Sequence, residues 1–159
     1  MKNFTGLTGG VLVSAAILLA GCSSSYKSPT GPTSATTSDT VTPFIAAGNW
    51  VVASLVQRTE DKTSQFSGYT FKFTSTGTDN GTVIATRNGS TVSGTWSHSA
   101  SVTYYGSTPS KESITLNLGT STPFDRLTKT WNVVSTTSAA FMLVSPEVLE
   151  DTHLVLTNQ

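Results

Sequence analysis

The stretch Tyr69-Thr70-Phe71-Lys72-Phe73-Thr74 decides the fold class, because aromatic and polar side chains alternate strictly along it. Successive residues of a β-strand point to opposite faces, so the three aromatic residues would share one face and the polar residues the other. The stretch therefore predicts a strand with one buried and one solvated face. Beyond Phe44, no stretch of about ten residues shows a convincing helical periodicity.

Seven further segments are rich in Val, Ile, Thr and aromatic residues and are separated by turn residues, which predicts eight strands in all. The predicted strands are Asn49–Arg58, Tyr69–Thr74, Thr82–Arg87, Thr91–Ser97, Ser113–Leu118, Thr130–Ser135, Ala139–Val144 and Thr152–Thr157. The pairs Asn80-Gly81 and Asn88-Gly89 predict tight hairpin turns, in which both central residues need positive φ. The stretch from Pro123 to Leu127 predicts one helical turn across a barrel end.

Eight short antiparallel strands joined by hairpins would leave two unpaired edges unless the sheet closes. We therefore predict an all-β domain over residues 44–159, folded as an eight-stranded antiparallel up-and-down barrel. An open sandwich is the alternative, but it needs Greek-key crossovers that the short central hairpins do not suggest.

The large apolar residues on the inward faces of these strands form the candidate ligand-binding interior. They are Trp50, Tyr69, Phe71, Phe73, Trp96, Ile114, Leu116, Trp131, Phe141 and Leu143. One interpretation is a cavity lined for an apolar small molecule. The other is a packed core without a cavity, because a barrel of this size is easily filled by its own side chains.

Four stretches of the predicted domain resemble the lipocalin-like domains of bacterial lipoproteins, within the calycin group. They are Gly48-Asn49-Trp50 at the start of the first strand, Tyr69-Thr70-Phe71-Lys72-Phe73, Gly94-Thr95-Trp96 and Trp131. The Thr-Asp-Tyr motif of classical lipocalins is absent. Arg126 is our candidate for the basic residue that packs over the first-strand tryptophan in that family. The resemblance implies a barrel that binds a small apolar or amphipathic ligand.

The N-terminal residues 1–21 have the three parts of a secretory signal: Lys2, the apolar run Val11–Leu19, and small residues before a cut. The apolar run is shorter than the about 20 residues that span a bilayer. Leu19-Ala20-Gly21-Cys22 resembles the lipobox of bacterial lipoproteins. The resemblance implies cleavage before Cys22 and lipidation of its thiol with a diacylglycerol carrying fatty acyl chains such as palmitate. Cys22 would thus attach the protein to a membrane.

The residue after Cys22 is Ser23 rather than an acidic residue, which resembles the pattern of lipoproteins sent to the outer membrane in enterobacteria. We therefore predict an outer-membrane anchor that faces the periplasm.

Residues 22–43 form a predicted disordered tether, with six Ser, six Thr and three Pro between Ser23 and Pro43. Such a segment has no apolar periodicity and cannot form a core. This tether would hold the folded domain away from the membrane.

The remaining composition excludes several function classes. The formal net charge is +0, which argues against nucleic acid as a partner. A single cysteine excludes an intramolecular disulfide and multi-cysteine zinc patterns. We expect His98 and His153 at surface or rim positions without metal, and Glu147, Glu150 and Asp151 as a solvated acidic turn. Tyr104 and Tyr105 lie on a loop and would pack locally or contact a ligand or partner at the barrel mouth.

No Gly-x-Ser-x-Gly, Walker loop or Gly-x-Gly-x-x-Gly motif marks a catalytic or cofactor site. We therefore expect no enzyme activity, no metal and no cofactor. The leading hypothesis is a membrane-anchored envelope lipoprotein whose barrel binds a small apolar or amphipathic ligand. The alternative is a solid-cored structural or protein-interaction module of the envelope. The sequence leaves the oligomeric state open.

Overall fold

A computed structural model describes residues 36–103 and 107–159, with side chains described from Asp39 onward. All of these residues fall within one compact unit, Pro32–Gln159. The predicted signal peptide, the lipidation site Cys22 and the predicted tether up to residue 35 lie outside the described residues. The gap also contains Tyr104 and Tyr105, so their predicted role, local packing or contact with a ligand or partner, concerns residues outside the described part of the chain.

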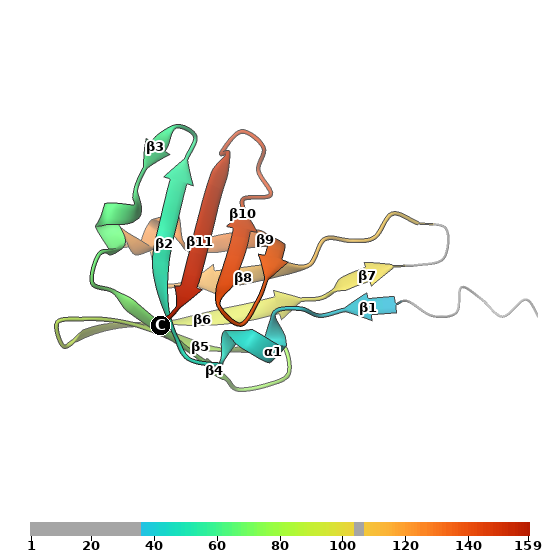
Figure 1. Cartoon of the computed structure of the whole chain (residues 1–159), viewed down its shortest axis with the longest axis horizontal. Coiled ribbons are helices and arrows are strands. Elements are labelled where there is room, and N and C mark those ends of the chain that lie inside the picture. The colour runs from blue at the N-terminus through green and yellow to red at the C-terminus, as the bar shows by residue number, and fades with distance from the viewer. Residues whose placement is uncertain (1–35, 104–106) are drawn as a thin grey trace, which may run out of the picture. The chain divides into compact units, whose positions relative to one another are not determined.

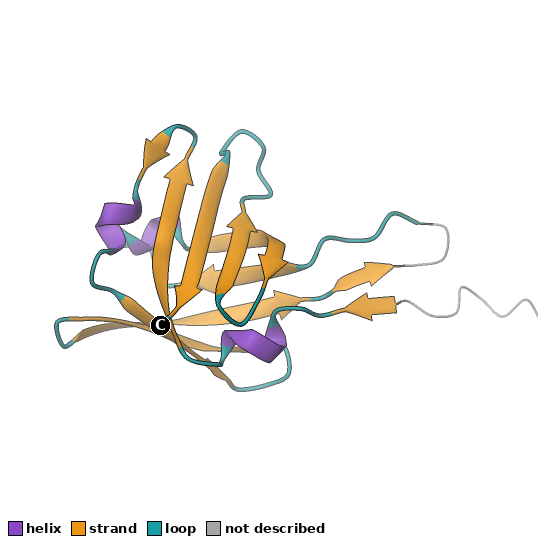
Figure 2. Cartoon of the chain, viewed as in Figure 1, coloured by secondary structure: helices purple, strands orange, loops and turns teal. Residues whose placement is uncertain are grey.

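The described residues form eleven strands and three short helices (Figures 1 and 2). The strands are β1 (Thr36–Ser38), β2 (Asn49–Gln57), β3 (Glu60–Asp61), β4 (Thr70–Ser75), β5 (Asn80–Arg87), β6 (Ser90–Ser99), β7 (Ser101–Thr103), β8 (Ser113–Asn117), β9 (Lys129–Thr136), β10 (Ala140–Val144) and β11 (Thr152–Asn158). The helices are α1 (Thr42–Ile45), η1 (Thr63–Phe66) and η2 (Phe124–Arg126). Within this part of the chain, no helix has the length and apolarity needed to cross a bilayer.

Eight of the strands close into an antiparallel barrel, as predicted. They pair in the order β2-β4-β5-β6-β8-β9-β10-β11, and β11 pairs back onto β2 to complete the ring. The short strand β3 pairs only with β2, and β7 pairs with β1 in a separate two-stranded ribbon. Because each barrel strand pairs with the next barrel strand along the chain, no Greek-key crossover is present among them, and the sandwich alternative is excluded.

The two predicted Asn-Gly turns have different outcomes. Asn88 and Gly89 join β5 to β6 with φ of 50° and 80°, so this hairpin turn is confirmed. The prediction is wrong for Asn80-Gly81, which lies inside β5, and the chain turns over residues 76–79 instead. A Cβ on Gly81 would lie 1.9 Å from the Thr74 carbonyl oxygen and 2.6 Å from Nε1 of Trp96. Glycine is therefore required here for close packing and not for a turn.

Each end of the barrel is covered by a short helix that a tryptophan holds in place. Nε1 of Trp50 donates a hydrogen bond to the carbonyl oxygen of Ile45, the last residue of α1, over 2.9 Å. Nε1 of Trp131 donates to the carbonyl oxygen of Leu127, directly after η2, over 3.0 Å. The predicted helical turn at the Pro123–Leu127 stretch is thereby confirmed.

The barrel has one weak seam, where β2 and β4 pair only through Asn49↔Lys72 and Trp50↔Phe71. Beyond these two pairs the chain between β3 and β4 forms η1, and Phe66 is buried there. The Phe66 ring lies 6.4 Å from the ring centroids of both Phe71 and Phe124. Aromatic side chains therefore fill the gap that the short ladder leaves.

The end of the predicted tether is structured, which corrects the expectation for residues 36–43. β1 pairs antiparallel with β7, and Val41 is buried in the apolar core. The Ser/Thr-rich composition gave no sign of this structure, because strand pairing uses backbone groups that every sequence has. One buried valine, Val41, attaches this segment to the core before α1.

Candidate functional site

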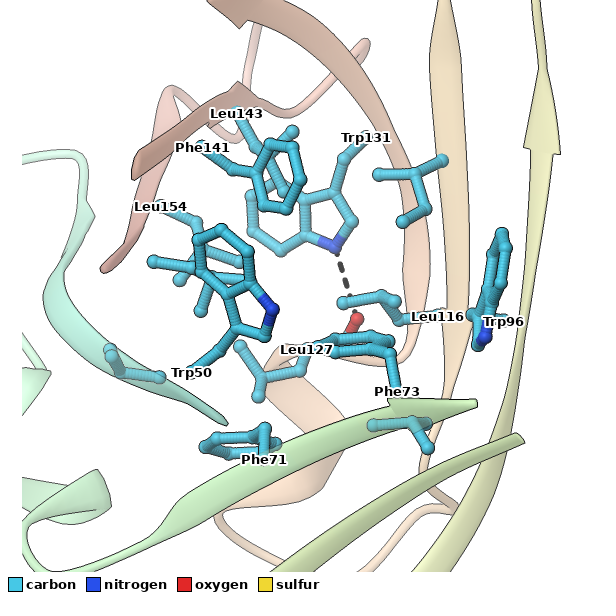
Figure 3. Packing of buried hydrophobic residues seen from close by; sticks show 14 of the residues in the cluster. Trp50, Phe71, Phe73, Trp96, Leu116, Leu127, Trp131, Phe141, Leu143 and Leu154 are labelled. Carbon is cyan, nitrogen blue, oxygen red and sulfur yellow. Dashed lines mark hydrogen bonds between the residues drawn. The ribbon is translucent and has the colours of Figure 1, made fainter. Parts of the chain in front are cut away.

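The interior of the barrel is filled by the residues that the sequence places there (Figure 3). Nine of the ten predicted interior residues are at most 3% exposed and belong to one apolar cluster. Trp50 stacks on Phe141 with ring centroids 4.4 Å apart. The indole N–H groups of Trp50 and Trp131 are both taken by backbone carbonyls. The side chains therefore act as packing partners of one another.

Tyr69, the tenth predicted interior residue, is only half-buried and lies at the edge of this cluster. Its ring packs edge-on against Phe124 at a centroid distance of 5.1 Å. The Arg87 guanidinium carbon lies 4.1 Å from the ring centroid, which is a cation–π geometry. Tyr69 thus seals the barrel beside η2.

A small hollow lies at this same end of the barrel. Its volume is about 150 Å³, and it is lined by Leu55, Gln57, Asp125, Arg126, Lys129 and Thr152. Ligand pockets for drug-sized molecules usually measure about 300–1,000 Å³. The hollow therefore has room for a small polar group and not for a lipid chain.

Arg126 is the main cationic group of the hollow. Its Nε donates to Oε1 of Gln65 over 2.9 Å, and its Nη1 donates to Oε1 of Gln57 over 3.0 Å. Gln57 ends β2 and Trp50 nearly begins it, which separates them by about 23 Å at the rise of a β-strand. The assignment of Arg126 as the group that packs over Trp50 is therefore wrong.

Lys129 also lines the hollow, and it forms an ion pair with Glu150. The hydrogen bonds from Lys129 and from the Ser145 hydroxyl hold the pKa of Glu150 below its ordinary value. A second hollow of about 460 Å³ adjoins this end, but it is lined only by the four consecutive residues Gln57, Arg58, Thr59 and Glu60. One turn of chain cannot surround a ligand, so the first hollow is the better candidate for binding.

A polar cluster lies where β6 and β8 leave the barrel beside α1. His98 lies at the centre of this cluster, and its side chain is 0% exposed. Nε2 of His98 lies 2.9 Å from Oε1 of Glu112 and 3.6 Å from Oδ1 of Asp39. On the other side of the ring, Nδ1 lies 3.4 Å from Oδ1 of Asp79 and 3.3 Å from Oγ1 of Thr42. One imidazole thus contacts three carboxylates.

Backbone and hydroxyl donors orient the two carboxylates that face Nε2. Glu112 accepts from the Thr40 N–H over 2.7 Å, from the Val41 N–H over 3.1 Å and from the Thr40 hydroxyl over 2.6 Å. Asp39 accepts from the N–H groups of Val41 and Thr42 over 3.1 and 3.0 Å. Burial raises the pKa of Asp39, but the hydrogen bonds from Thr42 and the nearby His98 outweigh burial and lower it.

The predicted surface or rim position is wrong for His98 and correct for His153. The chain segment 39–42 packs over His98 and buries it, whereas the His153 side chain is 59% exposed and contacts only Asp151 among the described ion pairs. Sequence reasoning missed Asp39 and Glu112, because the first lay in the predicted tether and the second in a loop 14 residues from His98.

No protein-family model matches the sequence, and no curated protein matches it. Among solved structures, a lipocalin-like protein from Bacteroides uniformis ATCC 8492 is 13% identical, with a TM-score of 0.45, and the alignment covers 72% of this chain and 98% of that chain. An uncharacterized protein from Bacteroides eggerthii DSM 20697 is 12% identical, with a TM-score of 0.44 and coverage of 72% and 99%. The barrel assignment rests on the strand pairing of this chain itself.

Proposed function

We propose that this chain is a lipoprotein of the bacterial cell envelope, held in the outer membrane through acylated Cys22 and facing the periplasm. Its lipocalin-like barrel is a solid, non-catalytic recognition module carried at the end of the tether. The stretch Leu19-Ala20-Gly21-Cys22 supports the anchor, and the Ser/Thr/Pro-rich residues that follow it support a spacer.

The packing of the barrel interior carries the proposal of a solid module. Trp50 and Trp131 are 0% exposed, and the other large aromatic residues of the interior strands are nearly as buried. Protein interiors of this kind are close-packed, so an apolar ligand could enter only by displacing several aromatic rings. Recognition is therefore assigned to the loops and ends of the barrel.

The loop between β10 and β11 is our candidate contact with a protein partner. At its tip, Val148 is 88% exposed and Leu149 is 85% exposed. Glu147 and Glu150 flank this apolar pair, which gives a small apolar centre with a charged rim. Apolar cores with polar rims are common in protein–protein interfaces.

A second candidate function is the binding of a small amphipathic ligand, which the sequence favours. The hollow of about 150 Å³ supports it, since Leu55 offers an apolar wall and Arg126 a cation. For this second candidate, the ligand would carry an acidic group that contacts Arg126 at the barrel end. The apolar part of the ligand would lie outside the packed interior.

Native mass spectrometry of the full chain, extracted from membranes in mild detergent, tests these proposals. We expect the mass of the chain from Cys22 plus its acyl groups, with no retained small molecule. Cys22→Ser should remove the added mass and release the protein into the soluble fraction, and membrane retention without lipid mass would overturn the anchor. A retained apolar molecule in wild type that persists in Arg126→Gln would overturn the solid barrel. A retained molecule lost in Arg126→Gln would favour the second candidate.

A further inference from the structure

We propose that Asp39, His98 and Glu112 form a binding site for a divalent transition-metal ion, with Zn²⁺ as the best match. One ligand atom from each of the three residues lies within 4.8 Å of the others. Zn–N and Zn–O bonds of about 2.0–2.2 Å place neighbouring ligand atoms roughly 3.3–3.6 Å apart in a tetrahedral site. The distances from Nε2 of His98 to the two carboxylates, 2.9 and 3.6 Å, bracket that spacing.

The charges of the cluster favour a bound cation. Asp39, Asp79 and Glu112 surround one imidazole, which carries at most a single positive charge. Among ion pairs of the described residues, none joins a Lys or Arg side chain to these carboxylates. The Glu112 side chain is only 10% exposed, so water screens its charge poorly. A divalent ion between Nε2 and the two carboxylates would balance this excess of negative charge.

The far side of the His98 ring has the arrangement that metal-binding histidines use. Metal-ligating histidines almost always give their second ring N–H to a carboxylate, a carbonyl or water, which fixes the tautomer. Nδ1 of His98 faces Oδ1 of Asp79 at 3.4 Å and the Thr42 hydroxyl at 3.3 Å. A proton on Nδ1 leaves the lone pair of Nε2 directed at the two candidate ligand carboxylates.

The mixed donor set selects the class of ion. Ca²⁺ and Mg²⁺ prefer sites made of oxygen ligands, whereas one imidazole with two carboxylates suits Zn²⁺ and similar transition metals. Three protein ligands leave one position for water. Asp39 is 34% exposed, so this open position faces solvent on the side of Asp39.

The location of the site gives the ion a structural role. Asp39 lies between β1 and α1, whereas His98 is the next-to-last residue of β6 and Glu112 precedes β8. An ion held by all three would fasten the chain that precedes the barrel to the barrel wall, next to the helix that covers this end. Because metal binding couples to the ordering of its ligands, removal of the ion should loosen residues 39–45.

The test uses the full chain, extracted with its lipid, treated with a chelator and then titrated with Zn²⁺ by calorimetry, and with Co²⁺ by absorption. We expect one equivalent of Zn²⁺ per chain and a Tm increase of about 5–10 °C at a hundred-fold excess over Kd. His98→Gln, Glu112→Gln and Asp39→Asn should each weaken binding by at least about ten-fold. Asp39→Asn guards against misfolding, because this side chain is partly exposed and makes fewer contacts.

His153→Asn is the matched control, because His153 also contacts a carboxylate, Asp151, at 3.1 Å but lies on the surface. This variant should bind Zn²⁺ as tightly as wild type and give the same Co²⁺ spectrum. Absence of a binding step in wild type would overturn the site, as would equal affinity in wild type and Asp39→Asn. In either case the cluster is a polar contact network between His98 and the three carboxylates around it, without an ion.

Discussion

The two ends of the barrel are closed in the same way but differ in their polar groups. At one end Trp50 holds α1 through an indole N–H to a carbonyl of the helix, and at the other Trp131 holds η2 through an indole N–H to the carbonyl of the residue directly after it. Both tryptophans are 0% exposed. The two ends are thus closed by the same kind of tryptophan contact, and they differ in the polar residues around that contact.

The polar residues of the two ends show this difference. Glu112 beside α1 is 10% exposed and is held by His98, Thr40 and Val41. Glu150 at the η2 end is 39% exposed and pairs with Lys129. Both glutamates lie shortly before a strand, β8 or β11, but Glu112 is the more buried of the two and accepts hydrogen bonds from the segment before α1. Burial, and not residue type, therefore separates a candidate binding cluster from a surface ion pair.

The largest expected effect comes from removing either sealing tryptophan. Trp50→Ala and Trp131→Ala should each lower the free energy of unfolding by about 3–5 kcal/mol, because a large buried side chain is replaced by a cavity. If the ends are closed equivalently, the two losses should agree within about 1 kcal/mol. Denaturant unfolding followed by circular dichroism measures both.

Val134→Ala is the control for these variants, since Val134 lies on the same strand as Trp131 but is 63% exposed. It should change the unfolding free energy by no more than about 0.5 kcal/mol. A loss below about 1 kcal/mol for Trp50→Ala alone would break the comparison, because α1 would then not be a required cover.

The barrel that both ends close was predictable from the sequence, whereas helix α1 was not. Alternation identified Phe71 and Phe73 as inward residues, and the strand count required closure. The predicted turn at Gly81 failed, because an Asn-Gly pair marks a turn only when the local hydrogen bonds close there. In this barrel the Trp96 indole lies close beside Gly81, which is part of β5. The chain turns earlier, at residues 76–79.

The differing features were not predictable. The His98 cluster draws one residue from the predicted tether, one from a strand and one from a loop, and no periodicity or spacing connects them. The carboxylates that the sequence did single out, at residues 147–151, belong to the more exposed end. Tertiary packing of a Ser/Thr-rich segment decided which acidic residues became buried.

The next effect in size concerns the buried glutamate. With metal removed by a chelator, Glu112→Gln should lower the free energy of unfolding by about 1–3 kcal/mol. The amide oxygen can still accept from the N–H groups of Thr40 and Val41, but the amide nitrogen then faces the Thr40 hydroxyl. The neutral amide also leaves His98 without its closest charged partner. Thermal unfolding in the presence of chelator measures this loss.

Lys111→Gln is the control for Glu112→Gln, because Lys111 is the exposed neighbour in the chain. It should leave the midpoint within about 2 °C of wild type, as expected for a surface substitution. A Glu112→Gln protein as stable as this control would remove the distinction between the two glutamates.

The smallest effect is expected at the more exposed pair of Glu150 and Lys129. The pKa of Glu150 is lowered below its ordinary value of 4.5 by the hydrogen bonds from Lys129 and Ser145. A carboxyl with a lowered folded pKa stabilises the fold above its unfolded pKa, and this contribution is lost as the pH falls through the folded value. Glu150→Gln should therefore cost at most about 0.5 kcal/mol at pH 7, because solvent screens the pair.

As the pH falls from the ordinary carboxyl pKa of 4.5 through the lowered folded pKa of Glu150, the stabilities of Glu150→Gln and wild type should converge, since the wild-type carboxyl becomes protonated. Glu147→Gln serves as the control, because Glu147 lies in the same loop and makes none of the ion pairs in the described part of the chain. It should show no pH-dependent difference from wild type. A Glu150→Gln cost as large as that of Glu112→Gln would mean that solvent exposure does not separate the two ends. The contrast between them would then need another physical cause, such as the number of hydrogen bonds each carboxylate accepts.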